Sequence, residues 1–457
     1  MIQFSFKAKG DDLLVVPLYK KGEAGASLSP SLKKEIEKPI KLHDFAGDEG
    51  ETFLLYAQSG RTLLLGLGEK GECSDETVRR AYGKLAKWCG KKKIKTISLL
   101  KPDDFADAAI EGILFPKAKE LNQVHLLGKW DQKKIDELEK VFKGIYLARD
   151  LINEDADSLN PQKLAKEAKK LSTAKLKVKS LTLSQIKKEK LGLVLAVGRA
   201  ADVDPAFIIM EYKGDPSNKD KTLLIGKGVT YDTGGLNLKQ SGMEEMKSDM
   251  GGAAIVIATM KVIEQLKLKI NVVALVPSIE NAIGPKSFKL GSVYTSHSGK
   301  KVEVTNTDAE GRLILADAIS YGIKHFKPAR IVDLATLTGA MTIILGNEGI
   351  GLFSNNDALS HKFEKAGLKT YERCFRLPLI EEYRDLLKTE AADLKNWNGR
   401  MGASIISALF LKEFVGNVPW VHLDIATVTY SQTARKYFPE YATGTGVRLL
   451  VETLRHL

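Results

Sequence analysis

Short apolar runs alternate with helical patterns along most of this chain, and this alternation limits its possible folds more than any other feature. In the second half, strand-like runs such as Thr222–Ile225 and Ile331–Leu334 flank helical patterns such as Gly252–Gln265. Alternating strands and helices build a mainly parallel sheet covered by helices, with ligands beyond the strand ends. The chain is therefore predicted to be an α/β protein. Further predicted strands are Leu193–Val197, Phe207–Tyr212, Ile270–Leu275 and Trp420–Leu423, and further helices are Leu313–Phe326 and Ala403–Phe414.

The chain is too long for one core. Single cores stop growing near about 250–300 residues, and this chain has 457. We predict a small α/β N-terminal domain (1–130), a linking helix (131–153) and a larger domain (154–457) with a mainly parallel central sheet flanked by helices. In the small domain, the predicted strands are Thr52–Tyr56, Thr62–Leu67, Lys95–Leu100 and Val124–Leu127, with a helix over Thr77–Trp88 capped by Ser74.

Composition excludes several classes of protein. The chain is 44% hydrophobic and 28% charged, which is typical of a soluble globular protein and too apolar for a disordered one. No run approaches the roughly 18–20 apolar residues of a membrane span, and the N-terminus lacks the apolar region of a secretory signal. The three cysteines, Cys73, Cys89 and Cys374, are too few and too dispersed for a disulfide framework, which indicates a cytoplasmic protein.

The formal net charge of +12 has two interpretations, an anionic partner such as nucleic acid or a lysine-rich solvated surface. The lysines are spread along the chain without a basic stripe interleaved with aromatic residues, so nucleic acid is the weaker interpretation.

Several familiar motifs are incomplete or absent. A G-x-G-x-x-G pattern at residues 66–71 follows a strand, but no acid stands about twenty residues further on, so we interpret it as a turn. Only seven histidines occur, and a histidine-built metal site is not expected. His297 lies in a Ser-His-Ser sequence interpreted as a polar turn, and His422 is interpreted as a core histidine.

Three segments concentrate residues that can do chemistry. The first, Gly226–Lys239, places Lys227 after an apolar strand, followed by Asp232, two glycines and Lys239. Paired glycines let backbone and ligand approach closely. A lysine beside an apolar strand tends to lose its charge or to bind an anion. Taken alone, this segment could also be a glycine-rich turn with solvated lysines.

The second and third segments each precede a predicted helix. In the second, Asp249 could cap the helix. In the third, Asp308, Glu310 and Arg312 would project together if the stretch is extended; a solvated turn with a local ion pair is the alternative. Acids gathered at strand ends need cations. Two divalent ions about 3.5–4 Å apart can activate a water, as in phosphatases, nucleases and peptidases.

Together the segments resemble the leucine aminopeptidase family, the two-metal cytosol aminopeptidases. The octapeptide Asn306–Leu313 matches the family signature. Gly226–Lys239 and Asp249–Gly252 match its metal-binding segments. The resemblance extends from about residue 148 to near the end, and implies that 154–457 is the catalytic domain. Further support lies in Arg149–Glu154, Ala335–Ala340, Asn398–Arg400 and His422–Ala426.

The resemblance implies that each subunit holds two divalent metal ions. Asp232 and Glu310 would bridge both ions, Lys227 and Asp249 would hold one, and Asp308 the other. Lys227 would have to coordinate as a neutral amine. The family favours Zn²⁺ or Mn²⁺, and the oxygen-rich donor set also admits Mg²⁺.

The resemblance also assigns catalytic and substrate positions. Lys239 would stabilise the oxygen charge that develops during the reaction. Arg312 is a poor base because it stays protonated, and in the family it holds a bicarbonate that shuttles the proton. The pocket for the N-terminal side chain would be lined by Met246, Thr336 and Gly339, with a backbone contact from Leu337.

The implied activity is that of a leucyl aminopeptidase, a hydrolase that releases N-terminal amino acids, with a leucine-type preference, through a water activated by two metals. The family further implies a cytoplasmic homohexamer acting on peptides, with no membrane association. The alternative is sequence-tolerant DNA binding through the +12 charge, in addition to or instead of peptidase activity. The sequence alone does not identify the preferred residue, the physiological substrates or the metals.

Overall fold

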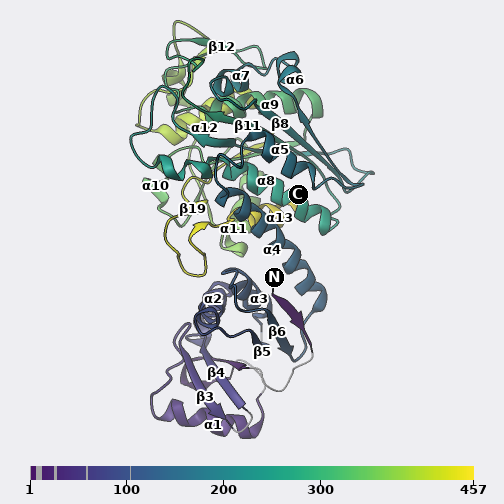
Figure 1. The fold of residues 1–457 in the computed structure, drawn as a ribbon, viewed down its shortest axis with the longest axis vertical. Helices are drawn as coiled ribbons and strands as arrows, with labels where there is room; N and C mark the ends of the chain where they lie inside the picture. Colours follow the sequence, from purple (N-terminus) through teal and green to yellow (C-terminus); the bar gives the residue numbers. More distant parts are fainter. Residues whose placement is uncertain (1, 7–12, 25–27, 58–59, 103) are drawn as a thin grey trace. The chain divides into compact units, whose positions relative to one another are not determined.

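Figure 1 shows a computed structural model, which describes residues 2–6, 13–24, 28–57, 60–102 and 104–457. The chain forms two compact units, one of Met1–Phe142 with Gln432–Glu440 and one of Lys143–Ser431 with Tyr441–Leu457. The boundary lies inside α4 (Gln132–Asn153), the helix predicted over 131–153. Among the described residues, no helix combines the length and apolar character needed to cross a membrane.

The smaller unit is built on a sheet with the strand order β1-β6-β5-β2-β4-β3. Among the described residues of this sheet, β3 and β4 pair antiparallel and the other neighbours run parallel. The strands and the helix predicted here are confirmed, and Ser74 Oγ accepts a hydrogen bond from Thr77 N at 3.3 Å as an N-cap. The elements are β1 (Gln3–Ser5), β2 (Leu13–Leu18), α1 (Pro30–Lys41), β3 (Thr52–Ala57), β4 (Gly60–Gly66), α2 (Asp75–Lys91), β5 (Thr96–Leu100), α3 (Ala106–Leu114) and β6 (Gln123–Leu127).

An aromatic cluster in this unit draws on residues from near the end of the chain. The ring of Phe115 lies 4.4 Å from that of Tyr437 and 5.2 Å from that of Phe438, centroid to centroid. The Tyr437 hydroxyl donates to Glu76 Oε2 at 3.0 Å, and both side chains are buried. The segment Gln432–Glu440 therefore contributes to the core of the smaller unit.

The larger unit contains a nine-stranded sheet in the order β16-β15-β18-β14-β9-β11-β8-β7, with β10 beside β11. The central neighbours β18, β14, β9 and β11 all run parallel. Antiparallel pairs lie toward the edges, where β8 pairs with β11 and β15 with β18. The mainly parallel sheet is thus confirmed. Its strands are β7 (Leu176–Leu181), β8 (Ala206–Lys213), β9 (Thr222–Gly226), β10 (Gly228–Asp232), β11 (Asn271–Asn281), β14 (Arg330–Ala335), β15 (Ile350–Ser354), β16 (Cys374–Arg376) and β18 (Trp420–Asp424).

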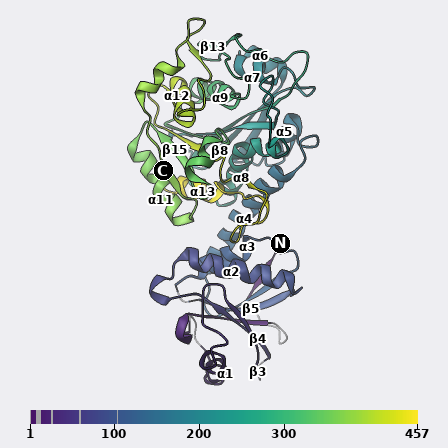
Figure 2. The ribbon, with the colours of Figure 1, turned by 90° about the vertical axis from the view of Figure 1, so that its left-hand side faces the viewer.

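Helices cover both faces of this sheet (Figures 1 and 2). On one face α8 (Gly251–Gln265) packs beside α13 (Val447–Leu454), which contacts α11 (Asp357–Thr370). On the other face α9 (Gly311–Phe326) packs between α7 (Gly192–Gly198) and α12 (Ala403–Val415). A large apolar core fills the space between this second layer and the sheet. The remaining elements include α5 (Pro161–Lys169), α6 (Leu183–Lys188), β12 (Val293–Thr295), β13 (Lys301–Glu303), α10 (Ala340–Leu345), η4 (Glu381–Leu387) and β17 (Leu394–Lys395).

One predicted strand is wrong, because Leu193–Val197 lies inside the helix α7. A short apolar run does not distinguish a strand from a buried helix. Here a distant side chain favours the helix: Asp317 Oδ2 accepts from Leu193 N at 2.8 Å and from Val194 N at 3.1 Å. These bonds satisfy N–H groups that a helix start leaves without intrahelical partners.

Candidate metal centre and active site

Neighbouring parallel strands deliver functional side chains to one edge of the large sheet. Lys227 follows β9, Asp232 ends β10, and Thr336 follows β14. Since the carboxyl ends of parallel strands meet at one edge, this is where α/β proteins bind ligands. Asp249 and Glu310 come from the segments that lead into α8 and α9.

Four carboxylates that the sequence singles out meet at this edge, and we call Asp232, Asp249, Asp308 and Glu310 the acid cluster. One carboxylate oxygen from each of Asp232, Asp308 and Glu310 lies within 4.8 Å of the other two. Asp249 joins them through Lys227, whose Nζ is 2.7 Å from Asp249 Oδ1 and 2.8 Å from Glu310 Oε1. The Asp308 side chain is 34% exposed and the other three acids are buried, so the cluster opens to solvent at Asp308.

Two glycines make room for Lys227. A Cβ on Gly311 would lie 2.5 Å from Lys227 Cε and 2.9 Å from its Nζ. A Cβ on Gly252 would lie 2.2 Å from the carbonyl oxygen of Leu334 and 2.9 Å from Lys227 N. Both approaches are closer than a real Cβ allows, so any other residue would displace the Lys227 side chain at position 311, or the backbone of β14 and Lys227 at position 252.

The segment Asn306–Leu313 is not extended. The condition under which Asp308, Glu310 and Arg312 would project together is therefore not met. It turns at residues 307–308 and enters α9 at Gly311. Thr307 fixes the turn, because its hydroxyl donates to the carbonyl oxygen of Gly234 at 2.7 Å and accepts from Asn237 N at 2.8 Å. The acids still meet, because the turn lies against the glycine-rich segment.

Asp249 does not serve as a helix cap. Within the part of the chain that the structure describes, α8 starts without a side-chain cap. Asp249 Oδ1 instead accepts from Thr336 Oγ1 at 2.6 Å and from Lys227 Nζ at 2.7 Å. The capping interpretation is therefore wrong, and the carboxylate is directed at the cluster.

The cluster holds more negative charge than its surroundings readily accept. Burial, with the charges of Glu310 and Asp232, raises the pKa of Asp249 above its ordinary value despite the opposing Lys227 ammonium. Burial and the same two carboxylates also raise the pKa of Asp308. Carboxylates that are this difficult to ionise together are stabilised by additional cations.

Two lysines supply positive charge within the cluster. Burial lowers the pKa of Lys227, but Asp249, Glu310 and Asp232 outweigh it and leave the pKa raised. The same balance raises the pKa of Lys239, whose Nζ lies 2.8 Å from Asp232 Oδ2 and 2.5 Å from Asp308 Oδ1. Both are therefore ammonium ions at neutral pH.

The donor atoms suit divalent cations. Asp249 Oδ2 is buried and has no hydrogen-bond partner among the described residues, whereas Glu310 Oε1 lies 2.8 Å from Lys227 Nζ. Buried oxygens normally have partners, so Asp249 Oδ2 is available as a ligand. A set rich in carboxylate oxygens suits Mn²⁺ or Mg²⁺, and Zn²⁺ also accepts such ligands.

Comparison with protein families decides what kind of protein carries this site. Residues 146–451 match the catalytic-domain model of the cytosol aminopeptidase family, and residues 15–116 match the model of its N-terminal domain.

The chain belongs to the cytosol aminopeptidase family. It is accordingly a metal-dependent aminopeptidase, a hydrolase that removes residues from the N-terminus of peptides.

Relatives and solved structures agree with this assignment. The aminopeptidase is 47% identical to the probable cytosol aminopeptidase of Protochlamydia amoebophila, over 99% of this chain and 97% of that protein. It is 42% identical to that of Chlamydia caviae, over 96% and 95%. Its fold matches a mutant of tomato leucine aminopeptidase with a TM-score of 0.88 and 31% identity, over 100% and 97%. It also matches the bottromycin maturation enzyme BotP in complex with Mn, with a TM-score of 0.88 and 30% identity, over 98% and 99%. These names refer to peptidases or a maturation enzyme, so DNA binding gains no support.

Arg312 lies in the first turn of α9, beside the acid cluster. Its Nη1 donates to the carbonyl oxygen of Asn396 at 2.8 Å, and its Nε is buried without a hydrogen-bond partner in the described chain. Burial lowers the pKa of Arg312 to about 10, so the side chain stays charged at neutral pH. A fixed, charged guanidinium with a free N–H can accept an anion.

Of the four predicted pocket residues, Thr336 and Leu337 follow β14 at the same edge. Thr336 contacts the cluster directly, since its hydroxyl binds Asp249 and its carbonyl oxygen accepts from Lys227 Nζ at 3.0 Å. Leu337 N donates to Asp424 Oδ1 at 3.2 Å. Met246 is half-buried in the 3₁₀ segment Met243–Met250. Gly339 is exposed, and a Cβ there would meet no atom within 4 Å.

Sequence reasoning missed three residues that hold the site together. Asn281 donates to Asp232 Oδ1 at 2.7 Å. Asn396 Oδ1 accepts hydrogen bonds from the backbone N–H groups of Thr305 and Asn306, and its Nδ2 donates to the carbonyl oxygens of Asn306 and Ala309. Asp424 belongs to the matching stretch His422–Ala426 but was given no role; its Oδ2 accepts from Thr338 Oγ1 at 2.6 Å. The signal for Asn396 was its position two residues before another matching stretch, Asn398–Arg400.

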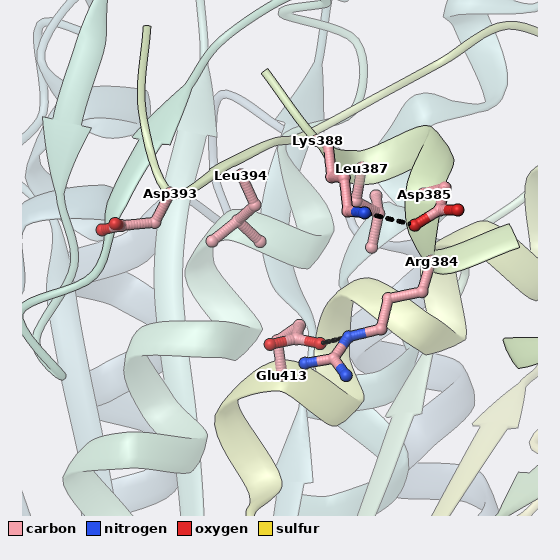
Figure 3. Close-up of a pocket in the computed structure, with 7 residues that line it drawn as sticks. All are labelled: Arg384, Asp385, Leu387, Lys388, Asp393, Leu394 and Glu413. Carbon is pink, nitrogen blue, oxygen red and sulfur yellow. Dashed lines mark ion pairs between the residues drawn. The ribbon is translucent and has the colours of Figure 1, made fainter. Parts of the chain in front are cut away.

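A separate hollow of about 290 Å³ lies between η4 and α12 (Figure 3). Ion pairs line it, with Arg384 Nε 2.5 Å from Glu413 Oε1 and Lys388 Nζ 2.6 Å from Asp385 Oδ1. None of its lining residues belongs to the predicted metal, catalytic or pocket sets. The hollow is therefore not part of the aminopeptidase centre.

Proposed function

We propose that Lys227, Asp232, Asp249, Asp308 and Glu310 hold two divalent metal ions, and that Lys239 and Arg312 act on the bound peptide. The convergence of the acids carries this proposal, since Asp232, Asp308 and Glu310 present oxygens within 4.8 Å of one another. Asp232 and Glu310 would be shared between the ions, Lys227 and Asp249 would complete one, and Asp308 the other. We propose Zn²⁺ or Mn²⁺ as the resident ions, with Mg²⁺ as a further candidate. The Mn named with BotP is consistent with this choice.

Metal affinity should rise with pH. In the metal-free chain the neighbouring carboxylates hold Lys227 as an ammonium, with a raised pKa. Because only the neutral amine can coordinate, metal binding there must release this proton. Above the range in which Asp249 and Asp308 titrate, both of which have raised pKa values, we expect the apparent affinity for Mn²⁺ at that position to rise about tenfold per pH unit. Chelator competition at alkaline pH, above that range, measures this slope. In Lys227→Met the number of protons released per bound ion, which sets this slope, should fall by about one. An unchanged slope would contradict a lysine ligand.

The chain's own residues orient and stabilise the reacting groups. Bound divalent ions supply Lewis acidity for the scissile carbonyl and the cleaving water. Lys239 presents its ammonium beside Asp232 and Asp308, where it can stabilise negative charge on the carbonyl oxygen as the bond is cleaved. Asn281 and Thr336 hold Asp232 and Asp249 in place through hydrogen bonds of 2.7 and 2.6 Å.

Arg312 positions an anion that moves the proton. Its Nη1 is bound to the carbonyl oxygen of Asn396, which leaves its buried Nε available within the described part of the chain. We propose bicarbonate as this anion. Bicarbonate can exchange a proton at neutral pH, whereas the guanidinium itself cannot. Asn396 fixes both the arginine and the turn before Asp308, and so acts as a positioning residue.

The substrate pocket favours an apolar N-terminal residue. Met246 and Thr336 would line the pocket, Gly339 would leave room for a branched side chain, and the Leu337 backbone would contact the peptide. We therefore propose a leucine-type preference. Rates on a panel of aminoacyl amides test it, and a preference for charged residues would contradict it.

An N-acetylated peptide should be cleaved at least about tenfold more slowly than its free form. A free α-amine can coordinate a metal, whereas the amide nitrogen of an acetylated terminus is a poor donor. Even about 1.4 kcal/mol of lost transition-state binding gives this factor. Mass spectrometry of both forms over time should show residues leaving one at a time from the free N-terminus. Equal cleavage, or early internal fragments, would indicate an endopeptidase.

We also propose that the enzyme assembles as a cytoplasmic homohexamer. Large apolar side chains are exposed on the larger unit, including Ile343 at 89% and Met401 at 89%. Such side chains are frequent at interfaces between subunits. Sedimentation velocity tests the proposal, and a monomer at micromolar concentration would contradict it.

A further inference from the structure

Three side chains with metal-binding atoms meet in the larger unit, away from the acid cluster. Glu189 follows α6, His297 lies in the turn between β12 and β13, and His325 lies in the last turn of α9. One ligand atom from each lies within 4.8 Å of the other two. Arg312 and His325 are thirteen residues apart on α9, which at about 1.5 Å per residue corresponds to about 20 Å. This group is therefore distinct from the active site.

The hydrogen bonds of His297 place a lone pair on Nε2. Ser320 Oγ donates to the carbonyl oxygen of Asp317 at 3.1 Å, so the hydroxyl can accept the Nδ1–H of His297, 2.9 Å away. The imidazole then carries its proton on Nδ1. Nε2 is buried and has no hydrogen-bond partner among the described residues. An imidazole that donates through one nitrogen and leaves the other free is typical of metal-ligating histidines.

His297 is also in the right charge state. Burial lowers its pKa to about 4; the neighbouring Lys324 and His325 act in the same direction and Glu189 in the opposite one. The ring is therefore neutral at physiological pH, as coordination requires. Its backbone is fixed as well, since His297 N donates to Asp317 Oδ1 at 2.7 Å.

The other two ligands are already close together. His325 Nε2 lies 3.1 Å from Glu189 Oε2, and the ring of Tyr321 packs against His325 with centroids 4.2 Å apart. Tetrahedral zinc with bonds of about 2.0–2.1 Å brings its ligand atoms to about 3.3 Å apart. The separation between Glu189 and His325 nearly meets this value, and a shift of about 1 Å by the turn would bring His297 into place. With His325 32% and Glu189 30% exposed, an ion can enter from solvent.

We propose that Glu189, His297 and His325 form an additional metal site for a late first-row divalent ion such as Zn²⁺. Two imidazoles and one carboxylate suit such ions, in contrast to the oxygen-rich acid cluster. Water would fill the fourth position. The bound ion would join α6, the β12–β13 turn and the end of α9. Such a site would differ from the sequence-based expectation that no metal site is built from histidine.

Zinc stoichiometry of the holoenzyme tests the proposal. By equilibrium dialysis, the unmodified enzyme should bind one more Zn²⁺ per chain than His325→Gln, while both cleave peptides at the same rate. Ser320→Ala, which removes the partner of His297 Nδ1, should weaken this additional site by about 10–100-fold. His361→Gln is the control, because His361 is exposed and lies outside the group. Equal stoichiometry in the unmodified enzyme and His325→Gln would overturn the proposal.

A spectroscopic signature separates this site from the acid cluster, which contains no histidine among its described members. Cu²⁺ bound through imidazole shows modulation from the remote ring nitrogen in pulsed electron paramagnetic resonance. This modulation should indicate two coordinated imidazoles in the unmodified enzyme and in His361→Gln, and at most one in His325→Gln. Two coordinated imidazoles in His325→Gln would contradict the assignment. Because His325 is exposed, this variant should fold even if His297→Gln does not.

Discussion

Replacing Glu310 by alanine should abolish peptidase activity and lower the metal content of the purified enzyme. Glu310 is 1% exposed, lies beside Lys227, and shares the cluster with Asp232 and Asp308. Its loss removes a carboxylate that both metal ions would share. Metal ions contribute several kcal/mol to catalysis, and about 4 kcal/mol corresponds to a rate loss of about a thousandfold. Asp308→Ala should have the same effect through the second ion.

Metal analysis together with steady-state rates checks this expectation. Asp385→Ala is a suitable control, because Asp385 is an acid of the same unit that lies in the separate hollow of Figure 3. It should keep full activity and full metal content. Normal turnover with intact metal in Glu310→Ala or Asp308→Ala would refute the ligand assignment. Circular dichroism of each variant establishes that the fold is unchanged.

Lys239→Ala should retain both metals yet lose about 10²–10³ in rate, the usual effect of removing one donor that stabilises a developing oxyanion. Its ammonium lies 2.8 Å from Asp232 Oδ2 and is 17% exposed, so it faces the acids from the solvent side. Removing a positive charge from this position should, if anything, strengthen cation binding. The two effects therefore have opposite directions, which distinguishes a catalytic lysine from a ligand.

The rate per bound metal pair is the quantity to compare, with Lys286→Ala as a matched control at an exposed lysine. The control should behave as the unmodified enzyme. If Lys239→Ala lost metal while the rate per metal pair stayed the same, Lys239 would be a ligand. A small change in both quantities would exclude it from the mechanism.

Local patterns predicted those elements of the fold that have clear boundaries. The strands Thr222–Ile225 and Trp420–Leu423 are apolar runs between turn-forming residues, and both lie at the centre of the large sheet. Leu193–Val197 was assigned wrongly because its helical state depends on Asp317, more than a hundred residues later. Contacts of this kind leave no periodic signal in the segment that they affect.

The candidate site likewise contains residues that local patterns predicted and residues whose roles depend on distant contacts. Lys227, Asp232 and Glu310 could be singled out because each stands at the boundary of a predicted element, where functional residues gather. The role of Asn396 could not be predicted, because it depends on the pairing of β13 with β17, which places its amide beside Asn306. His297 and His325 likewise become neighbours only through the packing of the β12–β13 turn against α9.

The aromatic cluster of the smaller unit affects the order in which the enzyme can mature during its synthesis. Phe115 leaves the ribosome more than three hundred residues before Tyr437 and Phe438, which pack against it. At about 5–20 residues per second, this interval lasts on the order of tens of seconds. Throughout that time the nascent N-terminal unit exposes an apolar surface that chaperones can recognise. The smaller unit is thus completed only after most of the larger unit has been made, and a fragment cut after α4 would retain this unfinished surface permanently.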